Sequence, residues 1–436
     1  MRPKGLCYLS GIDWAFYTLD HLSRKATGCG NASQAVLCLD RPLDIDKLKK
    51  NLLSFSRFFP AIRGQCARAW NLAPHWSYPE NTTEGIPVIS ETTASDDEAI
   101  AFLHACVNRP FANEREHLRF VYVTTGVHAY ISLVFDHRLL DARGAQNFLQ
   151  LFHQFYCGTF TLSEPFRPVR PSGLSLWKEK FSAGQRVNRR FLCLSRNCRV
   201  RHFPIPQEIK GRNFIFQTVA FDAPESGRIT EHAYNTAGYL MMAPYFLAVS
   251  LVALQDVFGK SLCEGDSFVI PVNTDIRSRN SGLQELFFNH LSFLFLKVPA
   301  RDVRSSKGFI QQVTRLMYDE MSGGFAQDLA KASLLFRVVP QPLLDTVHRS
   351  LMRTQDLSLS FSYVNKGYDA LEFCGAQVTG VIHTPRVAIN PGVGVFFTQF
   401  NGCISLTFAF LEGILSEQEA SSFIFRMRAL LLEAPG

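Results

Sequence analysis

Two stretches of the chain, one in the middle and one at the end, show the same succession of local patterns. In the first stretch, segments 119–124 and 129–135 are apolar or alternating and are separated by a Thr-Gly turn, which predicts two adjacent strands. Residues 142–156 follow, and their apolar side chains recur on one helical face. The first half of the chain is therefore expected to end in strand, strand and helix.

The second stretch repeats this order at the end of the sequence. Segments 394–400 and 403–410 alternate and are joined by Asn-Gly, which is a strong hairpin signal. Ser416 and Glu419 then form a capping box at the start of a helix that runs to about residue 433. Aligned position by position, the two stretches match ISLVF with ISLTF, Asp141 with Ser416, Ala145 with Ala420 and Phe148 with Phe423.

The repeat predicts a mixed α/β fold of two related subdomains. We place the first at residues 1–170, which also holds a helix predicted over 44–58, and the second at 213–436. Residues 171–212 would connect them as a basic crossover. A chain of 436 residues with 47% hydrophobic and 19% charged residues can build a large core, so extensive disorder is excluded.

Other features of the sequence favour an intracellular protein. Its eleven cysteines lack framework spacing, which is typical of reduced thiols, and the N-terminal residues lack the apolar region of a secretory signal. Residues 238–254 contain no charge, but this run of 17 is shorter than the ~20 residues of a membrane span and contains Pro244. It therefore predicts a buried core helix. We expect a cytoplasmic protein, with attachment to a membrane surface as the alternative.

The positive charge of the chain is concentrated around the predicted crossover. Residues 166–212 contain twelve Lys or Arg and two Glu, so this segment has a net charge of +10 and the rest of the chain −3. Trp177, Phe181, Phe191 and Leu194 interleave with the charges, as in a basic amphipathic surface segment. One interpretation is a solvated strap. The other is a landing surface for coenzyme A phosphates, an acidic acyl carrier protein or anionic lipids, and no nucleic-acid motif accompanies the charge.

The first copy of the repeat carries a histidine that the second copy lacks. His137 follows the strand at 129–135 and precedes the helix at 142–156, and loops at strand ends often display functional side chains. An imidazole there can accept a proton near neutral pH and return it, as acyl transfer to an alcohol or amine requires. The alternative is a structural histidine at a turn. Asp141 matches the capping residue Ser416, so we expect it to cap the helix rather than to complete a triad with His137.

Other kinds of site find little support in the sequence. No phosphate-binding loop and no G-x-G-x-x-G fingerprint occurs, which argues against nucleotide hydrolysis and dinucleotide redox chemistry. We expect no metal site, because two clusters of suggestive residue types lack a complete set of ligands. These clusters are Cys193, Cys198 and His202, and His104, Cys106 and His117.

The pattern H-x-x-x-D at 137–141, between a strand and a helix, resembles the signature of the coenzyme A-dependent acyltransferase superfamily. That superfamily includes chloramphenicol acetyltransferase, nonribosomal peptide condensation domains, wax ester synthases and plant BAHD acyltransferases. Three further segments are similar to family segments, in the same order: PVNTDIRSR at 271–279, FFNHLSFLFLKVP at 287–299 and LSFSYVNKG at 359–367. Together with the two-half layout, the resemblance covers most of the chain.

The sequence departs from the family pattern at several positions. Asp136 stands where condensation domains and wax ester synthases usually carry a second histidine. Ala142 replaces the glycine that usually follows the motif aspartate, with Gly144 two residues later. Phe288 replaces the glycine that usually precedes the asparagine, and the DFGWG motif of the plant enzymes is absent. These departures leave the subfamily unassigned.

The resemblance implies two chloramphenicol acetyltransferase-like subdomains that form a pseudo-dimer with an active-site tunnel between them. It implies an O- or N-acyltransferase in which His137 takes a proton from an acceptor hydroxyl or amine that attacks a thioester, without an acyl-enzyme. Asp141 and Arg277 would form an ion pair that shapes the His137 loop. The co-substrate would be acyl-coenzyme A or a phosphopantetheinyl thioester, with no tightly bound cofactor. The local candidates for contacts to the oxyanion or the substrate are Asn289, Ser360, Ser362 and Tyr363.

Two other interpretations stay open. A condensation-like module that binds a carrier protein or an acyl chain without catalysis would account for Asp136 in place of a histidine. A peripheral lipid-binding protein would use the basic segment at 166–212 together with the 38 phenylalanines of the chain. Release of free thiol from an acyl thioester distinguishes the acyltransferase from both.

Overall fold

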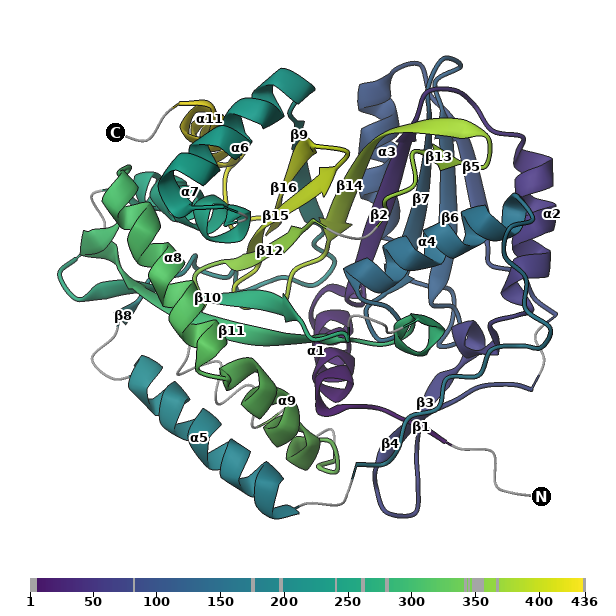
Figure 1. Cartoon of the computed structure of the whole chain (residues 1–436), viewed down its shortest axis with the longest axis horizontal. Helices are drawn as coiled ribbons and strands as arrows, with labels where there is room; N and C mark the ends of the chain where they lie inside the picture. The colour runs from purple at the N-terminus through teal and green to yellow at the C-terminus, as the bar shows by residue number, and fades with distance from the viewer. Residues whose placement is uncertain are drawn as a thin grey trace.

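The computed structural model describes residues 6–80, 83–173, 177–195, 199–239, 241–259, 263–278, 282–340, 343, 346, 357–365 and 368–433. Within these residues the strands form a six-stranded sheet, a seven-stranded sheet and a small three-stranded sheet. The two large sheets lie side by side, and each carries its own helices (Figure 1).

The six-stranded sheet is built mainly from the first half of the chain. Helices α2 and α4 share a buried core with one of its faces, and α3 packs on the other face, so the central strands are buried on both sides. The strands in spatial order are β13 (Glu372–Phe373), β14 (Ala376–Pro385), β2 (Ala32–Leu39), β7 (Ala129–Asp136), β6 (Leu118–Thr124) and β5 (Val88–Thr92). The helices of this half are α1 (Gly11–Thr27), α2 (Ile45–Ser56), α3 (Asp96–Val107) and α4 (Ala142–Tyr156). The small sheet consists of β1 (Cys7–Tyr8), β4 (Pro74–Ser77) and β3 (Gln65–Arg68).

The seven-stranded sheet comes from the second half of the chain. Its strands in spatial order are β11 (Leu291–Pro299), β10 (Asp266–Asp275), β12 (Ser360–Val364), β15 (Val393–Phe400), β16 (Cys403–Leu411) and β9 (Phe214–Ala220), with β8 (Arg199–Val200) paired to β10. The helices of this half are α6 (Ala223–Ala237), α7 (Met242–Phe258), α8 (Lys307–Ser322), α9 (Phe325–Phe336) and α11 (Glu417–Leu432). Helix α5 (Trp177–Ser195), inside the predicted crossover, packs along α9 (Figure 1).

The repeated ending is present in both subdomains. β6 and β7 form an antiparallel pair before α4, and β15 and β16 form one before α11. Asp141 accepts a hydrogen bond from the Gly144 N–H at the start of α4, and Ser416 accepts one from the Glu419 N–H at the start of α11. The equivalent residues Ala145 and Ala420 are both fully buried. The predicted mixed α/β fold of two similar subdomains is confirmed.

One strand of the second half of the chain joins the sheet of the first half. β14 belongs to the second half by sequence, yet it pairs antiparallel with β2, from Val378 opposite Leu39 to Pro385 opposite Ser33. It therefore extends the six-stranded sheet while it lies next to β15 and β16 of the other subdomain. This exchange brings the ring of His383, on β14, to 6.3 Å between centroids from the ring of Phe135, two residues before His137.

The apolar run at 238–254 behaves as the predicted core helix. Its described part includes most of α7, whose residues 244–254 are buried, and Leu240 lies outside the described residues. Within the described part of the chain no single helix is long and apolar enough to cross a bilayer. Helices α6 and α7, which are bent by 94° relative to each other, reach the length and apolar composition of a membrane span only when the two are taken together. The cysteines in the described part are free thiols.

Candidate active site

His137 lies where the two subdomains meet. It follows β7, and its backbone N–H donates to the Asn31 carbonyl at 3.2 Å. Two residues further on, the Leu139 carbonyl accepts from the N–H of Phe288, which directly precedes the second-half segment that leads into β11. The imidazole is half-buried and stacks on Phe16 of α1, with 4.6 Å between ring centroids. The loop is therefore held by the first helix and by the second subdomain together.

The side chain of Asn289 fixes the orientation of the His137 ring. Its Nδ2 donates to the His137 carbonyl at 2.8 Å and lies 3.4 Å from Asp13 Oδ1. The amide oxygen consequently faces His137 Nδ1, at 3.2 Å. An amide oxygen only accepts hydrogen bonds, so this network assigns the proton to Nδ1. Nε2 keeps its lone pair, which is the form that a general base requires.

Burial keeps the His137 imidazole neutral at physiological pH. Removal from water lowers the pKa of His137 below its ordinary value of 6.5, and the Asp141 carboxylate, which acts in the opposite direction, offsets this only in part. The ring therefore stays unprotonated to more acidic pH than an exposed histidine.

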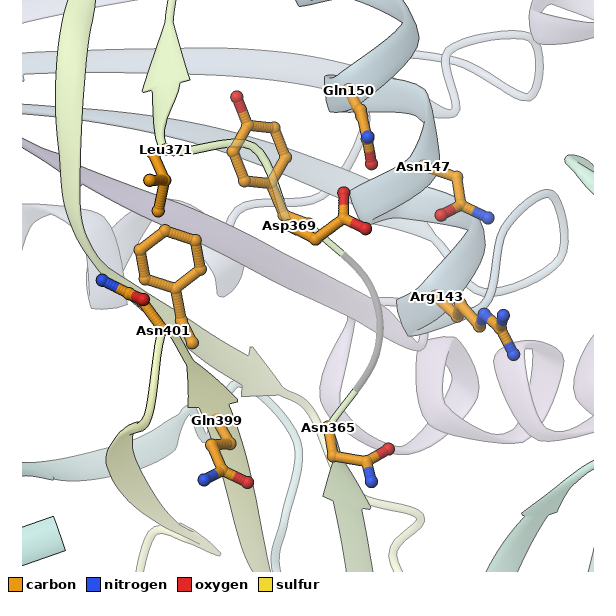
Figure 2. Close-up of a pocket in the computed structure, with 10 residues that line it drawn as sticks. Arg143, Asn147, Gln150, Asn365, Asp369, Leu371, Gln399 and Asn401 are labelled. Atoms are coloured by element: carbon orange, nitrogen blue, oxygen red, sulfur yellow. The ribbon is translucent and has the colours of Figure 1, made fainter. Parts of the chain in front are cut away.

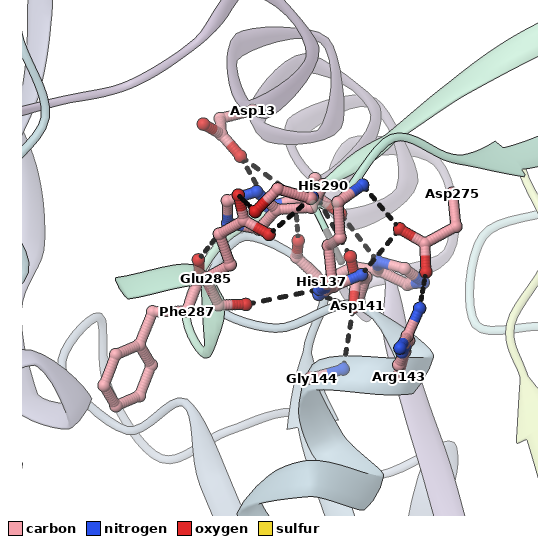
Figure 3. A network of polar contacts seen from close by, with 12 residues as sticks. Asp13, His137, Asp141, Arg143, Gly144, Asp275, Glu285, Phe287 and His290 are labelled. Carbon is pink, nitrogen blue, oxygen red and sulfur yellow. Dashed lines mark hydrogen bonds and ion pairs between the residues drawn. The ribbon is translucent and has the colours of Figure 1, made fainter. Parts of the chain in front are cut away.

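The Asp141 carboxylate joins three segments of the chain. Oδ1 accepts from the Gly144 N–H at 2.8 Å and from Arg277 Nη2 at 2.6 Å, and Oδ2 accepts from the His290 N–H at 3.0 Å (Figure 3). The Asp141 and Arg277 side chains are each 3% exposed. Burial alone would raise the pKa of Asp141, but Arg277 and the N–H donors lower it. The structure thus contains both the expected helix cap and the expected ion pair.

Three polar residues of this network were not predicted from the sequence. Asp13 accepts from the Asn289 N–H at 2.8 Å through Oδ1 and from Arg170 Nη1 at 2.8 Å through Oδ2. Arg170 also contacts the His290 ring, so the end of the first subdomain, directly before the crossover, reaches the site. The local signal for Asp13 is its capping box with Ser10, but its contact with Asn289 joins residues 276 positions apart.

Asp136, which replaces the second histidine of the family pattern, belongs to a buried ion network. It is 1% exposed and lies 2.9 Å from His117 Nδ1, and its carboxylate accepts from Arg138 Nε at 2.8 Å. Arg138 also donates to Glu114 at 3.1 Å. Burial would raise the pKa of Asp136, but Arg138 and His117 hold it well below its ordinary range. The Asp136 side chain is therefore engaged in ionic contacts within the first subdomain.

The two glycine departures have a geometric explanation. Phe288 adopts φ = 73°, in the left-handed region that glycine enters at little cost. Its ring packs edge-on against Trp76 at 5.7 Å and beneath the Arg170 guanidinium at 5.0 Å, which offsets part of the backbone strain. A Cβ on Gly144 would lie 2.7 Å from the Leu286 carbonyl oxygen. Glycine is therefore needed at 144, where the same loop approaches α4.

Tyr363 does not belong to this site. Its ring packs on Phe246 of α7 with 5.2 Å between centroids, and its hydroxyl donates to Gln399 at 2.5 Å. The residue therefore faces the side of the seven-stranded sheet that α7 covers, and Gln399, which accepts its hydrogen bond, lines a pocket beside α4. The sequence could not show this, because the face that a strand residue occupies depends on which side the helices cover.

Ser360 and Ser362 lie on the opposite face of β12 from Tyr363, because neighbouring residues of a strand alternate. Ser362 pairs with Phe396 of β15, and the Phe396 ring lies 6.2 Å from the ring of His383 on β14. Both serines thus share the face that approaches the first subdomain. Part of the predicted segment at 359–367, residues 366 and 367, lies outside the described residues.

A polar pocket of about 470 Å³ opens beside the start of α4 (Figure 2). Its walls come from α4 and from the second half of the chain, and they consist of Arg143, Asn147, Gln150, Asn365, Tyr368, Asp369, Leu371, Gln399, Phe400 and Asn401. A second pocket of about 290 Å³ shares Asn147 and Gln150 and continues along α4. The first pocket begins two residues from Asp141, at Arg143, which forms an ion pair with Asp275. The tunnel to His137 stays a prediction.

Much of the charge in the basic segment is neutralised inside the molecule. Arg186 and Arg190 of α5 pair with Asp328 and Glu320, and Arg170 pairs with Asp13. The opposite side of α5 exposes three apolar residues, Trp177, Phe181 and Leu192. Lys178 and Arg189 are also exposed and form none of the ion pairs among the described residues. Arg196 lies outside those residues.

The two cysteine–histidine clusters are not assembled into a metal site in the described part of the chain, where no group of three His, Cys, Asp or Glu side chains is suitably placed. His117 uses one ring nitrogen on Asp136 and the other on the Gly64 carbonyl. Cys198 lies outside the described residues.

Replacement of Asp141 by Ala removes a helix cap and leaves Arg277 buried without its carboxylate. We expect Asp141→Ala to lower the free energy of unfolding by about 3–5 kcal/mol, measured by urea denaturation. The matched control is Ser416→Ala, which removes the equivalent cap of the second copy but no ion pair, and should cost about 1 kcal/mol. Equal losses in the two variants would contradict the role assigned to the ion pair.

Comparison with solved structures identifies the fold. The condensation domain of the monacolin K polyketide synthase MokA matches with a TM-score of 0.64 and 14% identity, over 98% of this chain and 96% of that chain. The trichothecene 15-O-acetyltransferase TRI3 of Fusarium sporotrichioides matches with a TM-score of 0.71 and 11% identity, over 98% and 94%. The first condensation domain of the calcium-dependent antibiotic synthetase matches with a TM-score of 0.69 and 12% identity, over 99% of this chain and 98% of that chain.

No family model and no curated protein matches the sequence. At 11–14% identity the structural likeness shows a shared architecture, and the coverage shows that it extends over nearly the whole chain. The chain has the fold of condensation domains and of a trichothecene acetyltransferase, with two chloramphenicol acetyltransferase-like subdomains as the H-x-x-x-D resemblance implied.

Proposed function

We propose that this protein is an acyltransferase that moves an acyl group from a thioester to a hydroxyl or amine, with His137 as the general base. The observation that carries the proposal is the His137 ring itself. Asn289 holds it with Nδ1 protonated, Nε2 has no hydrogen-bond partner among the described residues, and burial keeps the ring neutral at the junction of the two subdomains. His117 differs, because both of its ring nitrogens are engaged, one on Asp136 and one on the Gly64 carbonyl.

The proposed reaction needs no covalent intermediate on the protein. His137 Nε2 takes the proton of the acceptor hydroxyl or amine as the acceptor attacks the thioester carbonyl carbon. The tetrahedral intermediate collapses, the carbon–sulfur bond breaks, and the departing thiolate receives the proton from Nε2 and leaves as a thiol. A positioned base of this kind contributes ~10²–10⁴-fold to the rate.

The oxyanion requires a donor other than the residues that hold His137. The Asn289 amide is occupied by the His137 carbonyl and Asp13, and Tyr363 faces α7. Of the predicted candidates, Ser360 and Ser362 are on the appropriate face of their sheet. We propose them as the hydroxyl donors for the oxyanion or the substrate.

The main rival is a module that binds an acyl chain or carrier protein without chemistry. The reason to consider this module is that Asp136 replaces a histidine of the family pattern. The ion network with Arg138 and His117 explains the presence of an aspartate at this position without reference to catalysis. Thioester binding without thiol release would favour the rival.

Replacement of His137 by Ala should abolish turnover and leave the protein folded. The assay incubates the protein with a panel of acyl-coenzyme A thioesters and with alcohol or amine acceptors, and it measures free thiol. We expect acceptor-dependent thiol release by the wild type and a loss of at least ~10²-fold in kcat for His137→Ala. Full turnover by His137→Ala, with an unchanged melting temperature, would refute the proposed base.

The pH dependence of kcat/KM should report the buried imidazole. Only neutral His137 accepts a proton, and burial lowers its pKa below 6.5. The plateau of kcat/KM should therefore extend below pH 6.5 before activity falls with further acidification. A midpoint above pH 6.5 on this acidic limb would contradict the assignment, since it requires a more basic group.

We propose that the donor is delivered by an acidic acyl carrier protein that docks on α5. The exposed side of α5 combines Trp177, Phe181 and Leu192 with Lys178 and Arg189, which form no ion pair within the described part of the chain. This combination suits an acidic surface with apolar contacts. This docking would use the part of the basic segment that internal ion pairs leave available.

Reversal of the two exposed charges tests this docking. The double variant Lys178→Glu/Arg189→Glu should raise KM for an acylated carrier protein several-fold, more at low salt, and leave KM for acyl-coenzyme A unchanged. Lys49→Glu/Lys50→Glu, on the exposed side of α2, is the control and should change neither value. If the double variant instead loses binding to anionic vesicles and keeps its KM for the carrier, α5 is a membrane surface.

A further inference from the structure

A second imidazole lies beside the His137 site, on the strand that crosses between the subdomains. His383 of β14 is directly opposite Ala35 of β2 and shares a sheet face with Phe135. Its ring is parallel to that of Phe135, with 6.3 Å between centroids, and the Phe135 ring lies 5.7 Å from that of His137. On its other side it meets Phe396 of the second subdomain. Phe135 therefore contacts both imidazoles.

The polar atoms of this region lack protein partners. His383 is 4% exposed, and neither of its ring nitrogens has a hydrogen-bond partner among the described residues. Ser33, directly opposite Phe135 and so on the same face, is fully buried, and its hydroxyl is likewise unpartnered within the described part of the chain. Buried polar groups without partners are costly, and these three atoms share the sheet face on which the Phe135 ring meets His137, so we take them to be sites for a ligand that reaches His137.

The chemistry of these atoms selects a neutral ligand group. Burial lowers the pKa of His383 to about 3, with a further contribution from His137, so the ring is uncharged and offers one N–H donor and one acceptor nitrogen. The Ser33 hydroxyl also donates and accepts. A carboxylate or phosphate would find no positive partner in His383 or Ser33, whereas a hydroxyl or a secondary amide would satisfy both.

We propose that His383 and Ser33 bind a hydroxyl or secondary amide of the substrate and so place the reacting group at His137. This inference rests on the proposed acyltransferase function and adds to it a class of substrate. The group has two possible sources, a hydroxyl or amide of the acceptor or the amides of the pantetheine arm of the thioester.

The opposite face of the same sheet supplies matched controls. Ser132 and Thr384 are fully buried, and their hydroxyls also lack partners among the described residues. Thr384 alternates with His383 along β14, and Ser132 precedes Leu133, which is on the Phe135 face. Removal of either hydroxyl takes away one buried unpartnered polar group and leaves the sheet face of Phe135 and His137 unchanged.

The test compares His383→Phe and Ser33→Ala with Thr384→Val and Ser132→Ala, using the thioester and acceptor that give thiol release. We expect the first two variants to lower kcat/KM about tenfold or more, mainly through KM, and to keep or raise the melting temperature. The controls should stay within about twofold of the wild type. His383→Gln, which keeps a donor and an acceptor, should retain more activity than His383→Phe.

The same variants distinguish the two sources of the bound group. A defect in His383→Phe that disappears with an alkyl thioester lacking amides assigns the site to the pantetheine arm, and a defect that persists assigns it to the acceptor. If His383→Phe matches the wild type while His137→Ala is inactive, this inference is overturned and the proposed function stands. An equal loss in His383→Phe and Thr384→Val, with lower melting temperatures, would show a merely structural role.

Discussion

The buried Asp141 carboxylate is the contact on which the geometry of the site depends. It accepts hydrogen bonds from the start of α4, from Arg277 at the end of β10 and from the backbone just before β11. Two of these partners belong to the second half of the chain, so one carboxylate joins the subdomains at the loop that carries His137. The ion pair is almost fully buried, and either charge alone would be strongly unfavourable there. The loop and the second subdomain are therefore held in one relative position.

The positioning of His137 is a consequence of that joint. Asn289 directly precedes His290, whose N–H binds Asp141, so the same contact sets Asn289 against the imidazole. Asp13 completes the arrangement by accepting from the Asn289 backbone and by pairing with Arg170. Two departures from the family pattern have a structural counterpart, since Asp136 is part of an ion network and Phe288 adopts a glycine-like backbone conformation.

The shared fold leaves the chemistry of the substrate to the interior side chains. Condensation domains and an acetyltransferase resemble this chain to a similar degree, so architecture does not distinguish among donors or acceptors. The polarity of the side chains around His137 would instead determine which donor and acceptor the site binds. His383 and Ser33 are uncharged and buried on the sheet face of Phe135, and α5 presents a surface that combines apolar groups with Lys178 and Arg189, for which the described residues supply no ion-pair partner.

The sequence by itself determined what depends on near neighbours along the chain. Helical spacing predicted α2 and α4, the Asn-Gly dipeptide predicted the β15–β16 hairpin, and the H-x-x-x-D spacing placed His137 and its capping aspartate, because these features arise within a few residues. Tertiary structure alone decided that β14 joins the first sheet, that Tyr363 faces α7, and that Asp13, Asn289 and His383 gather around His137. Those contacts join residues more than a hundred positions apart, and they follow from which faces the packing of helices and sheets buries, which no local pattern records.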